Sequence, residues 1–164
     1  MILAPAIDIQ PPPTFITSTV SARQTQDSFD PARLLSRNTT ENNWVALFPA
    51  RQALQKLGRL PNNWDTYGSP APSTEAIQKA VAFLDLAQRS ALMSGYAWAN
   101  PHVSASDDAS VIFEWWHGSH KLSIYVSADA VEFVQVWGAD IDHQMNDGEI
   151  HGDNFIGLWR WLNA

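Results

Sequence analysis

The chain of 164 residues contains no cysteine. That absence excludes disulfide bonds, zinc fingers, iron–sulfur ligation and thiol catalysis. Long apolar runs are missing too, because proline, glycine or charged residues interrupt every stretch before the roughly 18–20 residues of a membrane-spanning helix. No lysine or arginine precedes Arg23, whereas a secretory signal begins with a basic segment. The sequence therefore predicts a soluble, cytoplasmic protein that does not insert into a membrane.

Motifs of common enzymes are also missing. The sequence has no Gly-x-Ser-x-Gly elbow, phosphate-binding glycine-rich loop, His-Glu-x-x-His pair or dinucleotide fingerprint. The paired carboxylates Asp107 and Asp108 fall where a turn is expected, and solvated acids are typical there. We therefore expect no cofactor and no catalytic residue, and predict a protein that is not an enzyme.

The charges are distributed unevenly along the chain. The net charge is −7, and residues 101–164 hold ten acidic residues against two basic ones, whereas residues 1–100 hold seven against eight. Such a field repels phosphate backbones and anionic membranes and favours basic partners or cations. Direct nucleic-acid binding is not expected. The simpler interpretation is that surface acids keep a small protein in solution.

Composition divides the chain into a tail and a domain. Residues 1–40 combine three consecutive prolines with Ser/Thr/Gln-rich sequence, which cannot bury enough apolar area to offset the entropy of ordering. They predict a disordered tail, with a short helix at Pro31–Leu35 after a capping Asp30. Residues 41–164 predict a single compact α+β domain.

Three longer helices are expected from apolar spacing and capping residues. The first runs from Pro49 to Leu57, before Gly58. Ser73 caps the second, which spans Thr74–Met93 and stops at Gly95. The third follows a capping Asp153 and has apolar residues at helical spacing. Those residues are Phe155, Leu158, Trp159 and Leu162.

Between the last two helices the sequence predicts an antiparallel meander of three to four strands. A turn at Gly118-Ser119 would pair His117 with His120, Trp116 with Lys121 and Trp115 with Leu122. A second turn at Ala128-Asp129 would pair Val126 with Val131. A further strand around Val103 and Ala105 would precede a turn near Asp107-Asp108. This register places six apolar residues on one face, as a half-buried sheet requires. They are Val111, Phe113, Trp115, Leu122, Ile124 and Val126.

Three features together resemble a known protein family. They are the loop Leu60-Pro-Asn-Asn-Trp-Asp-Thr-Tyr-Gly68, the sequence Pro72-Ser73 opening a helix, and the strand sequence Phe113-Glu114-Trp115. This pattern resembles a family of small uncharacterised bacterial proteins with a Trp-Asp-x-x-Gly loop, a Ser-capped helix and a Glu-Trp strand. The likeness covers residues 57–137. It implies the same fold and no particular activity.

The loop beginning at Trp64 is one candidate binding site. Trp64 and Tyr67 flank the carboxylate of Asp65, a grouping that could hold a ligand or a partner peptide. The structural interpretation is favoured: Trp64 closes the edge of the core, Asp65 accepts backbone N–H bonds, and Gly68 supplies a positive φ.

The segment Asp140 to Asp153 is a candidate metal site because it is rich in carboxylates and contains His143 and His151. As a calcium loop starting at Asp142 it fits poorly, with Asp147 where glycine is needed and Asp153 where glutamate is needed. His117 and His120 could also bind a divalent metal, although exposed turn histidines are commoner.

The opposite face of the sheet gives the main hypothesis. Trp115 and Trp116 are neighbours on a strand and must point to opposite faces. The second face collects Ile112, Glu114, Trp116, Tyr125, Val134 and Val136, and a solvated face would be more polar. Either the tail or the C-terminal helix covers it, or it is an interface.

We therefore predict a protein-binding module of inhibitor, antitoxin or immunity-like type. It would hold a basic protein partner on an acidic, aromatic surface formed by six residues. They are Trp116, Tyr125, Glu114, Glu132, Trp64 and Tyr67. The alternatives are a divalent-metal protein or metal-dependent enzyme using the Asp140 to Asp153 segment, and a structural homodimer that self-associates through the open sheet face.

Overall fold

The computed structural model describes residues 45–140, 142–152 and 154–164. The tail expected over residues 1–40, the helix expected at Pro31–Leu35 and the capping Asp153 lie outside these ranges. The described part contains three helices and a five-stranded antiparallel sheet, which confirms the α+β class. None of the helices in these ranges is both long and apolar enough to cross a membrane.

Helix α2 has the bounds that the sequence predicts, Thr74–Met93. At its start the Ser73 hydroxyl accepts a hydrogen bond from the Ala76 N–H at 3.0 Å, which satisfies one of the free amides of the first turn. At its end Gly95 adopts a φ of +80°, and its N–H donates to the Leu92 carbonyl at 3.1 Å. This left-handed residue closes the helix with few unpaired carbonyls.

The first helix differs from its prediction at the N-terminal end. The helix over residues 45–57 already includes the residues before Pro49, so the prediction that it begins at Pro49 is wrong. Its buried stripe of Leu47, Ala50 and Leu54 starts before the proline and holds this turn on the core. Helix α3 spans Phe155–Leu162, with Asn154 at the N-cap position and no side-chain capping bond.

The sheet is a meander in which each strand pairs with the next. The prediction of three to four strands is wrong by one strand, since part of the segment expected as an acidic loop forms the fifth. The strands are β1 (His102–Ala105), β2 (Val111–His117), β3 (His120–Val126), β4 (Val131–Val136) and β5 (Met145–Glu149).

The predicted register is confirmed at both hairpins. His117 pairs with His120 across a turn in which Gly118 has a φ of +57°, a value that suits glycine at the first turn position. Val126 pairs with Val131 across the second turn. The strand expected around Val103 and Ala105 is present as β1, and its Val103 pairs with Phe113. Turn chemistry therefore fixes which side chains share a face.

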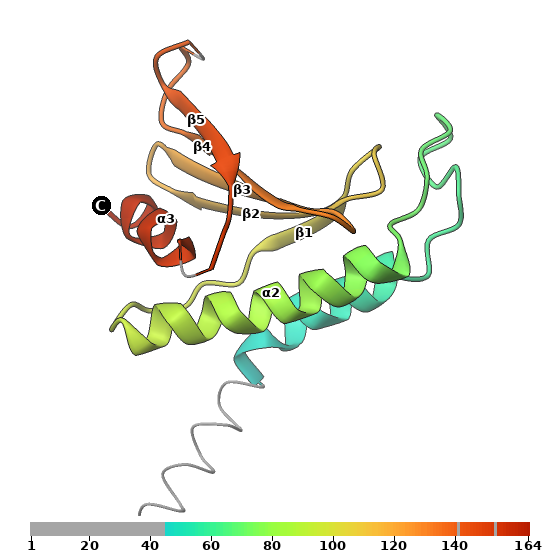
Figure 1. Cartoon of the computed structure of the whole chain (residues 1–164), viewed down its shortest axis with the longest axis horizontal. Coiled ribbons are helices and arrows are strands. Elements are labelled where there is room, and N and C mark those ends of the chain that lie inside the picture. Colours follow the sequence, from blue (N-terminus) through green and yellow to red (C-terminus); the bar gives the residue numbers. More distant parts are fainter. Residues whose placement is uncertain (1–44, 141, 153) are drawn as a thin grey trace, which may run out of the picture.

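All helices of the described part lie on one side of the sheet, with α2 and the 45–57 helix running together and α3 beside them (Figure 1). We call the sheet face toward them the helix-side face. Its six predicted apolar residues are 0–3% exposed, as expected for a core. In α3, Trp159 packs on Trp115 with ring centroids 5.6 Å apart, so the C-terminal helix belongs to this side.

Candidate functional site

The far face is the face of the sheet turned away from the helices, and the strand register orders it in three rows. The Trp116 row contains Trp116, Lys121, Val136 and Met145. The Glu114 row contains His102, Glu114, Ser123, Val134 and Asp147. The Tyr125 row contains Ser104, Ile112, Tyr125, Glu132 and Glu149.

None of the described helices covers the far face, because α3 packs on the helix-side face. The sequence allowed either the C-terminal helix or the tail to cover this face. The prediction for the C-terminal helix is therefore wrong, and the tail lies outside the described residues. Trp116 is 57% exposed, whereas its neighbour Trp115 is 3% exposed. Ile112, Tyr125 and Val134 are half-buried.

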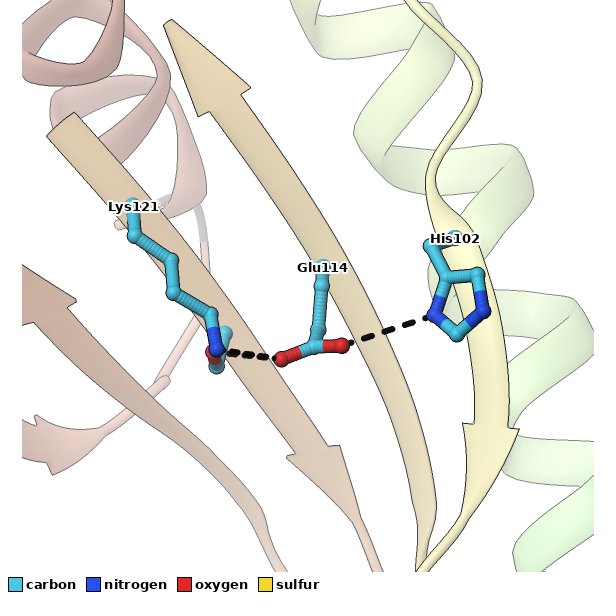
Figure 2. A network of polar contacts seen from close by, with 4 residues as sticks. His102, Glu114 and Lys121 are labelled. Carbon is cyan, nitrogen blue, oxygen red and sulfur yellow. Dashed lines mark hydrogen bonds and ion pairs between the residues drawn. The ribbon is translucent and has the colours of Figure 1, made fainter. Parts of the chain in front are cut away.

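A polar network crosses the middle of the far face (Figure 2). The Glu114 carboxylate contacts Lys121 Nζ at 2.6 Å through Oε1 and His102 Nδ1 at 3.4 Å through Oε2. The Ser123 hydroxyl donates to Oε1 at 3.4 Å. These four residues come from β1, β2 and β3, so the contacts tie three strands together. The Glu114 side chain is only 18% exposed.

The network keeps Glu114 ionised. Burial acts to raise the pKa of Glu114, but the hydrogen bond and charge of Lys121, followed by those of His102, outweigh it and leave the pKa below its ordinary value. A carboxylate with a lowered pKa and an ammonium partner is a poor general acid or base at neutral pH. Chemically this site can present charge and aromatic surface, and it is not arranged for proton transfer.

Trp116 lies at one end of this network. Its ring centroid is 5.5 Å from Lys121 Nζ and 6.3 Å from the His102 ring. Tyr125 shares the far face as predicted, but it belongs to the row at the other end, about 14 Å away along the strands. Glu132 is the direct cross-strand neighbour of Tyr125. The aromatic residues therefore mark two separate ends of one surface.

The Tyr125 row also carries an unusual charge pair. Glu132 of β4 lies directly opposite Glu149 of β5. Like charges in this position destabilise a sheet. The Nε2 atom of the His151 imidazole lies 3.5 Å from the Glu149 carboxylate. This corner of the far face is therefore strongly acidic.

The Trp-Asp loop has the internal structure that the sequence predicts. Asp65 Oδ1 accepts hydrogen bonds from the Tyr67 N–H at 3.0 Å and the Ser69 N–H at 3.3 Å, and the Ser69 hydroxyl donates to Oδ2. The Ser69 hydroxyl, ahead of the backbone amides, holds the pKa of Asp65 below its usual value. Gly68 has the expected positive φ, +96°.

The aromatic residues of this loop lie apart from the far-face network. Trp64 is half-buried, donates to the Pro70 carbonyl at 3.3 Å and is not packed against the main core, so the expected role as a core plug is wrong. Tyr67 is 92% exposed. The loop lies at the opposite end of the sheet from the β2–β3 turn (Figure 1). The structure therefore does not bring Trp64 and Tyr67 together with Trp116.

The candidate metal segment is divided between an edge strand and two short turns. Asp147 and Glu149 are strand residues of β5, and His143 pairs with Asp140 at 3.0 Å. Among the residues with a described position, no group of three or more His, Asp or Glu side chains is arranged to hold a metal ion. Sequence reasoning missed β5 because Met145–Glu149 lacks alternating apolar residues.

The two turn histidines have structural partners on α3. His117 Nδ1 lies 3.1 Å from the Leu162 carbonyl oxygen, and the His120 ring stacks on Trp161 with centroids 4.6 Å apart. Each imidazole therefore packs the end of the β2–β3 hairpin against the C-terminal helix.

No protein-family model, curated protein or solved structure matches this chain. The resemblance carried by the Trp64 loop and the Glu114-Trp115 strand stays a prediction. The feature of the described chain that supports a functional argument is the far face. It has an exposed aromatic residue beside a partly buried carboxylate network at one end and the facing glutamates Glu132 and Glu149 at the other.

Proposed function

We propose that the far face binds a basic protein partner and that the protein acts as an inhibitor, antitoxin or immunity-like module and not as an enzyme. The observation that carries the proposal is the 57% exposure of Trp116 on a sheet face without a described helix over it. Leaving an indole ring in water is unfavourable, and aromatic anchors of this kind concentrate binding energy in protein interfaces.

The charges of the far face support a basic partner. Lys121 is the single lysine or arginine in its three rows, and it forms an ion pair with Glu114. Glu132, Asp147 and Glu149 are exposed on the same face. A partner with a complementary basic surface would be steered toward this face and would lose affinity with added salt.

Affinity capture from cells of the source organism tests the proposal with three immobilised proteins. They are the wild type, Trp116→Ala and Trp116→Phe. We expect a basic protein to be retained by the wild type and by Trp116→Phe, and to bind Trp116→Ala roughly 30-fold more weakly, which corresponds to the loss of one anchor worth about 2 kcal/mol. The same proteins retained by all three would contradict the proposal.

Tyr67→Ala is the matched control because Tyr67 is more exposed than Trp116 but lies at the other end of the sheet. We expect its affinity for the captured partner to stay within about twofold of wild type, as is usual for residues away from the anchors. A loss equal to that of Trp116→Ala would mean that the interface extends around the end of the sheet to the Trp64 loop.

A further inference from the structure

The outer surface of the helices is the most apolar exposed part of the described chain. Five of the eight large apolar residues that are exposed in the described ranges lie there. They are Val45, Phe48, Leu86, Leu92 and Met93. Single exposed apolar residues are ordinary, but a group of this size indicates a contact surface.

A groove of about 290 Å³ is lined by residues of the 45–57 helix and of α2. Apolar side chains and two glutamines line it, together with Arg51, which is paired with Asp85. Its lining residues are Phe48, Arg51, Gln52, Leu54, Gln55, Ile77 and Val81. The apolar lining suits an aromatic ring, and the amide oxygens of the glutamines could accept a hydrogen bond from an indole N–H.

The helix layer carries the charge opposite to that of the far face. Residues 45–93 contain five basic residues and three acidic ones. The two helices are antiparallel neighbours, as Gly58 beside Ile77 and Arg51 beside Asp85 indicate. Lys56, Arg59 and Lys79 therefore lie at the end where the first helix stops and α2 starts, an end that also holds Glu75 in the first turn of α2.

Both surfaces have an apolar end and a charged end. On the far face Trp116 and Met145 mark the apolar end, and Glu132 and Glu149 mark the acidic corner. The diagonal from Trp116 to Glu149 is about 20 Å. On the helix layer Phe48 and its apolar neighbours, with Arg89 beside them on α2, mark one end, and Lys56, Arg59 and Lys79 mark the other. The 45–57 helix is about 20 Å long. The two patterns match in size and in sign.

We propose that the partner of the far face is the helix layer of a second copy of this chain. Trp116 of one copy enters the groove beside Phe48 of the next, and Glu132 and Glu149 face Lys56 and Lys79. This inference rests on the proposed function, because it identifies the partner whose surface meets the far face. The chain as a whole is acidic, with a net charge of −7, and the basic residues of residues 45–93 supply the complementary surface. Two far faces do not meet each other, since their acids would repel. Contact between different surfaces is heterologous and builds rings or open chains.

Sedimentation velocity of the purified chain tests the inference with one variant of each surface. The wild type should show a mass that rises with protein concentration and falls with added salt. Trp116→Glu removes the far-face anchor and Phe48→Glu blocks the groove, so each variant alone should be monomeric. Mixed in equal amounts they should form a dimer of one copy each, because each retains the surface that the other lacks.

Charge reversals give a second test that spares the apolar residues. Glu132→Lys and Lys56→Glu change exposed side chains, so both variants should keep the wild-type melting temperature. Each alone should associate at least tenfold more weakly than wild type, and their mixture should recover association, since the new lysine meets the new glutamate.

Three results would overturn the inference: a wild type that stays monomeric at its highest soluble concentration, a Phe48→Glu variant that still self-associates, or mixtures that remain monomeric. If the wild type is monomeric and a captured basic protein binds it but not Trp116→Ala, the self-association is contradicted and the proposed function is supported. If the captured proteins are the same with and without Trp116, but the mixed variants do form a dimer, the proposed function is contradicted and the self-association is supported.

Discussion

The two faces of the sheet differ most clearly at two adjacent tryptophans. Trp115 is 3% exposed among aromatic rings of α3, and its indole N–H donates to the Ala99 carbonyl at 2.8 Å. Trp116 is 57% exposed beside Lys121. Strand geometry forces this alternation, because successive side chains point to opposite faces. The comparison teaches that the same residue type serves folding on one face and remains exposed on the other.

The first prediction tests this comparison where its effect should be largest. Trp115→Ala should cost about 3–5 kcal/mol of unfolding free energy, because it opens a cavity in the core and removes ring contacts. Trp116→Ala should cost less than about 1 kcal/mol, since surface substitutions change little. Urea denaturation of both variants measures the difference and needs no knowledge of a partner. Equal losses would mean that the far face is also core and that the proposed interface is wrong.

The helix-side face was predictable from the sequence because turn and strand chemistry agree there. Glycine at the first position of the β2–β3 turn fixes one register, and that register places apolar residues from Val111 to Val126 on a single face. A shift of the register by one residue would have placed all of these side chains on the solvent-exposed face. Ser73 and Gly95 fix the ends of α2 in the same local way.

Strand β5 and the division of the candidate site were not predictable in this way. Met145–Glu149 is held by pairing with β4, and its polar side chains give no period that separates a strand from a loop. The sequence also cannot tell that the Trp64 loop lies at the far end of the sheet from Trp116, because that distance depends on the path of α2. Long-range placement depends on tertiary packing and not on local residue preference.

Substitution of two glycines by alanine should change the stability by an intermediate amount. An added Cβ meets no atom at either position, so the two variants differ in backbone strain. Gly68→Ala places a Cβ at a φ of +96° in the Trp64 loop, so we expect a loss of about 1–2 kcal/mol in stability. Gly157→Ala adds a Cβ in α3 with open space around it, and it should stabilise the protein by about 0.5–1 kcal/mol. Thermal denaturation of the two variants checks both signs. A neutral Gly68→Ala would mean that the Trp64 loop relaxes easily and that the positive φ of Gly68 carries no strain cost.

The smallest effect is expected in the polar network of the far face. Glu114→Gln removes a carboxylate whose Lys121 partner is partly exposed, so at neutral pH it should cost about 0.5–1 kcal/mol of unfolding free energy. The pKa of Glu114 is lowered in the folded protein, since Lys121 and His102 outweigh the effect of burial. A lowered folded pKa stabilises the protein above the ordinary glutamate value of 4.5, and this contribution is lost as the pH falls through the folded pKa.

Glutamine does not titrate, so the difference between wild type and Glu114→Gln should be largest near neutral pH and should shrink as the pH falls below 4.5. The carboxyls of Asp65 and Asp108 also have a lowered pKa, but they are present in both proteins and cancel in the difference. Urea denaturation at several pH values from 7 to 3 measures it, and added salt should reduce it at neutral pH. A difference that stays constant with pH would show that Glu114 contributes packing alone, and that the far face is held together without the charge that the proposed interface requires.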